Sequence, residues 1–126
     1  MRVVLVVFLA VALAVAATGC GVGPATNQEK ISKTASTYLK ALADSDTATA
    51  CAQLTPRARG EACDHMMKER LPRLDPEVLK AAASDSMDID VDGNRATAGL
   101  SEPQGARLLL VKTSNEWRID SGYTLK

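Results

Sequence analysis

The hydrophobic pattern divides the chain into three parts. Fifteen consecutive apolar residues, Val3 to Ala17, follow a single basic side chain, Arg2. Between residues 27 and 83, apolar residues recur every three or four positions, which predicts amphipathic helices. From residue 87 onwards they alternate with polar residues, which predicts strands with one buried face. This order predicts an α+β domain, with N-terminal helices packed on one face of a C-terminal antiparallel sheet of about four strands.

Four helices are predicted in the middle of the chain. The first covers residues 27–43, because Thr26 and Glu29 fit a capping box. Asp44 to Asp46 interrupts it, and a second, short helix follows from the spacing of Ala48, Cys51, Ala52 and Leu54. Thr55-Pro56 is a cap followed by a first helical position, so we expect a third helix that runs as far as Pro72. It would turn these side chains toward the core: Ala58, Ala62, Cys63, Met66 and Met67. The fourth covers residues 76–83.

Four strands are predicted after the helices. In the first, Met87, Ile89 and Val91 alternate with aspartates, and Asp92-Gly93 is a hairpin turn signal. The second carries Ala96, Ala98 and Leu100 on one face, and a turn is expected at residues 103–105. Residues 106–112 form a central apolar strand. After a turn at Ser114-Asn115, the last strand points Trp117 and Ile119 inward.

The N-terminal apolar run has the three parts of a bacterial secretory signal: a charged start, an apolar stretch and small residues at its end. The alternative is a transmembrane helix. Fifteen helical residues span roughly 22 Å, less than the roughly 30 Å hydrocarbon core of a bilayer. The run also ends in Thr18-Gly19-Cys20 rather than in a basic cluster. The pattern therefore favours a signal peptide.

Ala17-Thr18-Gly19-Cys20 resembles the lipobox of bacterial lipoproteins, with Ala17 where that family most often has leucine. The resemblance implies that the Cys20 thiol receives a diacylglycerol group and that residues 1–19 are removed. Two acyl chains anchor a protein stably, whereas one is marginal. The alternative is an ordinary signal peptide with an incidental cysteine. We expect residues 20–26 to be the lipidated cysteine and a linker, and residues 27–126 a single domain in the cell envelope, on the extracytoplasmic side of a membrane.

Two cysteines, Cys51 and Cys63, remain once Cys20 is lipidated. An even pair outside the reducing cytoplasm favours a disulfide. Closing a loop of about a dozen residues would add about 3 kcal/mol to the free energy of unfolding. Two free thiols, or a metal site with His65, are the alternatives, although the spacing matches neither CxxC nor HxxxH.

Charge and aromatic content narrow the range of partners. The chain has 15 basic and 15 acidic side chains, whereas nucleic-acid binding needs a clustered basic face. Only Tyr38, Trp117 and Tyr123 remain as aromatics beyond the signal peptide, too few for a base-stacking platform. We expect a monomer that binds no nucleic acid, metal or cofactor.

Three sequence features suggest chemistry without defining a site. Asp88 to Gly93, DIDVDG, begins like a calcium loop, but its twelfth position is Gly99 instead of glutamate. The alternation within this stretch favours a solvated strand face. His65 is the only histidine, and no motif places a nucleophile beside it. The third helix is basic, and a solvated face explains this better than attraction to anionic lipids; its basic residues are Arg57, Arg59, Lys68, Arg70 and Arg73.

The stretch YLKALADSDTATACAQLTPRAR, Tyr38 to Arg59, resembles the helix–Asp–helix opening of the nuclear-transport-factor-2-like superfamily. Trp117-Arg118-Ile119 is similar to the Trp-x-Ile strand near the end of small lipoproteins of this type. The resemblance implies a cone with an apolar cavity, for which Tyr38 and Trp117 are the candidate lining residues. Ketosteroid-isomerase-like members place a tyrosine and aspartates inside the cone. Tyr38 and Asp120 are the candidates here, but neither lies in a recognisable catalytic motif.

We therefore expect a non-catalytic lipoprotein that binds an envelope protein or a small apolar molecule. The alternative is a carrier, or an isomerase- or hydratase-type enzyme, built in the same cavity. An enzyme needs at least two titratable groups with shifted pKa values facing a cavity. A carrier needs an apolar cavity of about 300 Å³ or more. An interaction protein exposes an apolar patch above a filled core.

Overall fold

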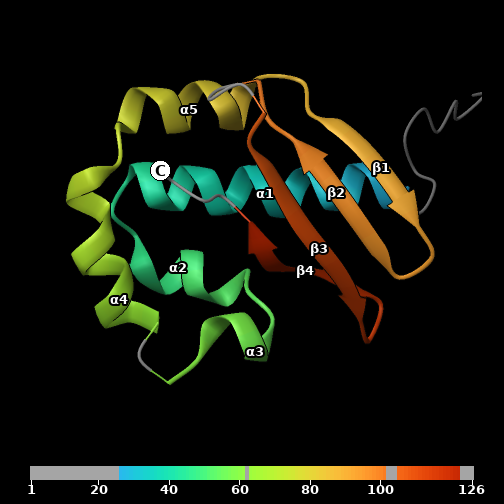
Figure 1. Ribbon diagram of the computed structural model, residues 1–126, viewed down its shortest axis with the longest axis horizontal. Coiled ribbons are helices and arrows are strands. Elements are labelled where there is room, and N and C mark those ends of the chain that lie inside the picture. The colour runs from blue at the N-terminus through green and yellow to red at the C-terminus, as the bar shows by residue number, and fades with distance from the viewer. Residues whose placement is uncertain (1–25, 62, 102–104, 123–126) are drawn as a thin grey trace, which may run out of the picture.

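The computed structural model describes residues 26–61, 63–101 and 105–122 (Figure 1). The helical part consists of α1 (Asn27–Ala43), α2 (Thr47–Ala52), α3 (Pro56–Arg59), α4 (Cys63–Arg70), a 3₁₀ turn (Leu71–Arg73) and α5 (Pro76–Ser84). The strands are β1 (Asp88–Asp92), β2 (Arg95–Gly99), β3 (Arg107–Thr113) and β4 (Glu116–Gly122). The predicted α+β fold class is confirmed. The predicted signal peptide, Cys20, Ala62 and most of the turn at 103–105 lie outside the described residues.

The four strands form one antiparallel sheet in the order β1-β2-β3-β4. Two-residue turns join β1 to β2 and β3 to β4. Gly93 has φ 60°, and Ser114 and Asn115 have φ 49° and 64°. Positive φ values match the right-handed twist of hairpin strands, so both predicted turns are present.

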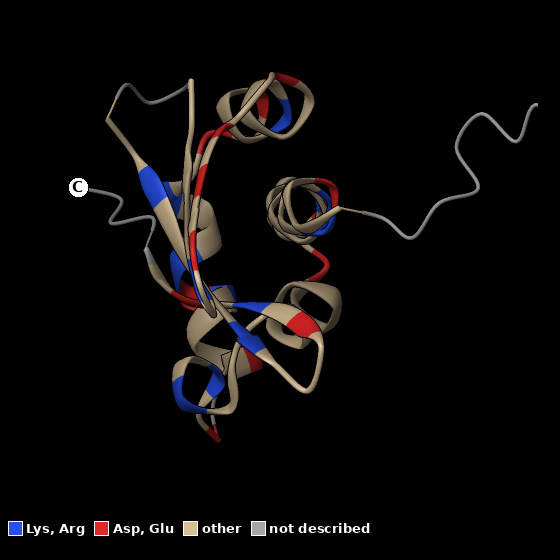
Figure 2. Cartoon of the chain, turned by 90° about the vertical axis from the view of Figure 1, so that its right-hand side faces the viewer, with Lys and Arg blue, Asp and Glu red and all other residues tan. Residues whose placement is uncertain are grey.

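The first helix begins and ends where the sequence predicts. Thr26 caps it by accepting a hydrogen bond from the Glu29 amide at 3.2 Å. In Figure 1, α1 crosses behind the sheet; Figure 2 shows the sheet beside it. Two side chains tie α1 to its neighbours: the Ser36 hydroxyl donates to the Ala83 carbonyl at 2.9 Å, and the Trp117 indole donates to Asn27 at 3.4 Å.

The core lies between α1 and one face of the sheet. The sheet contributes alternate residues of β2, β3 and β4, all buried: Ala96, Ala98, Leu108, Leu110, Trp117 and Ile119. The helices contribute, among others, Ile31, Leu39, Leu42, Leu79 and Ala82. Alternation along a strand sends the remaining residues to the opposite face. We call that opposite side the open face; its side chains are Asp88, Asp90, Asp92, Arg95, Thr97, Arg107, Leu109, Val111, Arg118 and Asp120.

The predicted third helix is wrong, because the chain breaks it in two at Gly60. This glycine has φ 59° and ψ −179°, a conformation outside the helical region that glycine adopts without a side-chain clash. The predicted inward orientation of Met66 also fails, because this side chain on α4 is 46% exposed. The predicted short helix is present as α2, in which Ala50 and Cys51 are buried while Ala48 and Ala52 face solvent.

Candidate functional site

Asp120 occupies an irregular position in β4. Leu109 of β3 pairs with Ser121 and Leu110 pairs with Ile119, so Asp120 is the extra residue of a β-bulge. A bulge leaves one residue out of the ladder and redirects its side chain. Asp120 consequently reaches past the sheet edge toward the segment that precedes α3.

That segment is held against β4 by backbone hydrogen bonds. The Thr55 amide donates to the Ile119 carbonyl at 2.8 Å, and the Ile119 amide donates to the Gln53 carbonyl at 2.8 Å. Leu54 and Ile119 therefore form a parallel bridge. These bonds cover the outer edge of β4 and fix the place where α3 begins.

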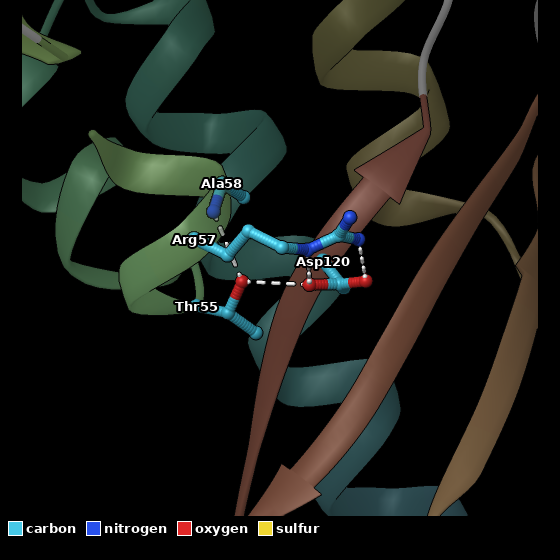
Figure 3. Close-up of polar contacts among 4 residues, drawn as sticks. All are labelled: Thr55, Arg57, Ala58 and Asp120. Carbon is cyan, nitrogen blue, oxygen red and sulfur yellow. Dashed lines mark hydrogen bonds and ion pairs between the residues drawn. The ribbon is translucent and has the colours of Figure 1, made fainter.

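Thr55, Arg57 and Asp120 form one polar cluster, which we call the Asp120 cluster (Figure 3). The Thr55 hydroxyl caps α3 by accepting from the Ala58 amide at 3.2 Å, and it donates to Asp120 Oδ1 at 2.8 Å. Arg57 donates from Nε to the same oxygen at 3.3 Å and from a terminal nitrogen to Oδ2. Both carboxylate oxygens are thus occupied by donors.

The hydrogen bonds within the cluster favour the ionised carboxylate. The Arg57 guanidinium, and then the Thr55 hydroxyl, hold the pKa of Asp120 below its ordinary value. A general base in an enzyme operating near neutral pH needs a raised pKa. The cluster therefore positions α3 against β4 and places an ion pair at the rim of the open face.

A hollow of about 730 Å³ lies beside this cluster on the open face. The residues that line it come from all four strands and from α3: Asp90 and Asp92 of β1, Arg95 and Thr97 of β2, Leu109 and Val111 of β3, Asp120 and Ser121 of β4, and Arg57. Leu109 is 44% exposed, although it lies on an interior strand of the sheet. The hollow therefore combines an exposed apolar centre with charged borders.

Tyr38 lines a different, smaller cavity of about 220 Å³ between α1, α4 and the end of β4. Burial raises the pKa of Tyr38, and the charge of Arg70 opposes that effect. The phenol is neutral at physiological pH, where it can donate a hydrogen bond. Trp117, the other predicted lining residue, is not part of this cavity. It is 2% exposed and packs in the core, and it also borders a separate surface hollow of about 290 Å³ together with Lys30, Lys33 and Thr34 of α1.

Cys51 and Cys63 form a disulfide that links α2 to the start of α4. Both cysteines are buried, and α3 lies within the loop that the disulfide closes. The predicted pairing is confirmed, with one correction: the two cysteines lie on α2 and α4 rather than on consecutive helices. The bridge holds together the part of the chain in which the helices are shortest.

The remaining sequence candidates lie on the surface. His65 is exposed on α4, and its Nε2 lies 3.2 Å from Oε1 of Glu69. Asp88, Asp90 and Asp92 alternate along β1, as the strand prediction required. Among the described residues, no three histidine, cysteine or carboxylate side chains are grouped to hold a metal ion. Nor is any described helix long and apolar enough to cross a membrane.

Sequence reasoning missed the exposed position of Leu109 and the pairing of Arg57 with Asp120. Leu109 stands in the run Leu108-Leu109-Leu110-Val111, which hides the alternation that would place it on the open face. The distance in sequence between Arg57 and Asp120 conceals their pairing. The Thr55-Pro56 cap was the only local signal near this cluster.

Comparison of the chain with models of protein families, with curated proteins and with solved structures finds no match.

Proposed function

We propose that this protein is a lipid-anchored extracytoplasmic binding domain whose open face contacts a protein partner. The observation that carries the proposal is the exposed Leu109 at the centre of the hollow, since folding alone gives no reason to keep a leucine there. Exposed apolar groups framed by polar ones are typical of interaction sites. The partner would cover Leu109 with an apolar group and direct a basic group to Asp90, which lies opposite the uncharged Thr97.

Export is supported by the disulfide, because such bonds persist in oxidising compartments. The lipobox-like sequence before Cys20 adds a reason for membrane attachment. Cys20→Ala should move the protein from the membrane fraction to the soluble fraction of the producing cells. Metabolic labelling with a radioactive fatty acid should mark the wild type and not the variant. Membrane association that survives the substitution would contradict lipid anchoring.

The binding role can be tested with two matched substitutions. Leu109 and Met66 are comparably exposed, at 44% and 46%, but only Leu109 lies on the open face. Leu109→Asp should reduce recovery of the partner from solubilised membranes at least tenfold, a loss expected for a central interface residue. Met66→Asp should leave recovery unchanged. Equal recovery with both variants would contradict binding at the open face.

The carrier or enzyme alternative has less support. The cavity beside Tyr38 has about 220 Å³, below the roughly 300 Å³ of typical small-molecule sites. The hollow on the open face is larger, at about 730 Å³, but five of its lining side chains are charged. Asp120 also borders the cavity beside Tyr38, but its pKa is lowered and its oxygens are held by Arg57 and Thr55. Binding of a protein partner therefore remains the function that we propose.

A further inference from the structure

The outer edge of β1 carries backbone groups that no strand of the described residues covers. β1 is a terminal strand of the sheet, whereas the other terminal strand, β4, is bridged by Leu54. Figure 1 shows β1 at the right-hand border of the sheet. The two edges of the sheet therefore differ in their capacity to accept another strand.

The pairing register identifies the outward-facing backbone groups. The Asn94 carbonyl accepts from Lys112 at 2.8 Å and the Leu100 amide donates to Ala106 at 2.9 Å, so even-numbered β2 residues bond toward β3. The odd-numbered ones bond toward β1, where they face Asp88, Asp90 and Asp92. Alternation in an antiparallel pair then directs the amides and carbonyls of Ile89 and Val91 outward. Within the described residues, no hydrogen bond reaches these four groups.

The side chains of β1 have opposite characters on its two faces. Ile89 and Val91 are half-buried and pack against the core. The three aspartates are exposed on the open face. Asp92 lies directly opposite Arg95, but Asp90 and Asp88 lie opposite Thr97 and Gly99, which carry no charge.

A groove of about 610 Å³ lies next to this edge, between β1, α1 and the end of α5. Ala83, Met87 and Ile89 are its apolar lining residues. The others are polar or charged: Gln28, Glu29, Ser32, Lys33, Ser36, Ser84, Asp85 and Ser86. The Ser36 hydroxyl already bonds to the Ala83 carbonyl. A strand added beside β1 would direct every second side chain into this groove, where valine or alanine would contact Met87 and Ile89.

We propose that the β1 edge binds an extended segment of a protein partner in which basic residues alternate with small or medium apolar residues. The added strand would pair with Ile89 and Val91 through backbone hydrogen bonds, as in β-strand addition. Its apolar side chains would enter the groove, and its lysines or arginines would lie beside Asp88 and Asp90. This inference rests on the proposed binding function and specifies the chemistry of the partner.

Charge selects a basic partner over a second copy of the chain. Antiparallel pairing of two β1 strands would bring two rows of aspartates together, and like charges on neighbouring strands are destabilising. Charged residues on edge strands also prevent such self-pairing in natural proteins. The same aspartates attract lysine or arginine on an incoming strand.

The test uses the full-length protein, purified in detergent with its disulfide intact, and an acetylated heptapeptide of alternating lysine and valine, KVKVKVK. On binding, hydrogen exchange of the Ile89 and Val91 amides should slow, as measured by NMR. Asp88→Asn with Asp90→Asn should weaken binding about threefold to tenfold, from the loss of two cross-strand charge pairs. The peptide EVEVEVE should not bind.

N-methylated peptides separate strand addition from plain charge attraction. In an added strand, one alternating set of amides donates hydrogen bonds to β1: the valine amides if the strand is antiparallel to β1, and the lysine amides if it is parallel. Methylating that set should weaken binding at least tenfold. Methylating the other set should have little effect. Binding that tolerates both, or no binding of KVKVKVK, would overturn the proposal.

A substitution in β1 itself tests which kind of strand binds at the β1 edge. Val91→Pro removes an outward amide without breaking the β1–β2 ladder, a substitution that edge strands accept, and it should abolish peptide binding. A dimer of the wild type that dissociates in this variant would make the occupant a second copy and overturn the proposal. These measurements do not depend on Leu109, so their failure leaves partner binding at the open face to its own test.

Discussion

The two faces of the sheet are built from alternate residues of the same strands but have opposite chemistry. In β3, Leu108 and Leu110 are fully buried under α1, whereas Leu109 between them is 44% exposed. In β4, Trp117 and Ile119 are buried, whereas Asp120 leaves the ladder and bonds to Thr55 and Arg57. One face is therefore explained by packing alone.

The open face has features that packing does not explain. Its border on β1 is acidic, its centre is apolar and the Asp120 cluster forms its opposite border. The difference between the faces is the physical basis for assigning stability to one and binding to the other.

The largest expected effect on stability comes from a substitution on the sheet face that packs against α1. Leu110→Ala should lower the free energy of unfolding by about 2–5 kcal/mol, because it leaves a cavity under α1. Urea unfolding at neutral pH measures this difference. A loss below about 1 kcal/mol would mean that this face is not a packed core, as large-to-small core substitutions cost more.

Loss of the disulfide should lower the free energy of unfolding slightly less than Leu110→Ala can. Replacing both Cys51 and Cys63 by serine should lower the free energy of unfolding by about 3 kcal/mol, since the loop they close is then free in the unfolded chain. Reducing the wild type should give the same shift in urea midpoint. An unchanged midpoint after either treatment would contradict a stabilising bridge.

The Asp120 cluster should give a smaller, pH-dependent effect. Because the pKa of Asp120 is lowered in the folded protein, its stabilisation is present above the ordinary aspartate pKa of about 3.9. It is lost as the pH falls through the lowered value. The stability gap between wild type and Asp120→Asn should therefore be widest near neutral pH and narrow below about pH 4. A gap that widens on acidification would contradict the ion pair.

The smallest effect on stability is expected at the centre of the open face. Leu109→Asp should change the free energy of unfolding by no more than about 0.5 kcal/mol, because the side chain packs against little. Thermal and urea unfolding of Leu109→Asp and of Leu110→Ala, measured under the same conditions, compare the two losses of stability. A loss comparable with that of Leu110→Ala would show that Leu109 serves the fold and would remove the case for binding.

Local patterns predicted most of the fold. The bounds of α1, the Thr55-Pro56 start of α3 and the alternation in β1 follow from capping and periodicity. The break at Gly60 was missed because the apolar spacing continues across it. The resemblance to the nuclear-transport-factor-2-like superfamily stays a prediction.

The candidate site was less predictable because it depends on distant residues. The disulfide could be inferred by counting cysteines, without any knowledge of geometry. The pairing of Arg57 with Asp120 requires the bulge in β4 and the bridge from Leu54 to Ile119, neither of which has a local sequence signal. Trp117 was a candidate lining residue through the resemblance alone; it packs in the core and also borders a surface hollow of about 290 Å³.

The most direct test of the open face is photo-crosslinking in intact cells, with benzoylphenylalanine at position 109 or, as the matched control, at position 66. The two side chains they replace are comparably exposed, but only Leu109 lines the hollow of the open face. Position 109 should yield a discrete crosslinked protein partner, and position 66 should not. Crosslinking that is absent at position 109, or equal at both positions, would contradict a binding role for the open face.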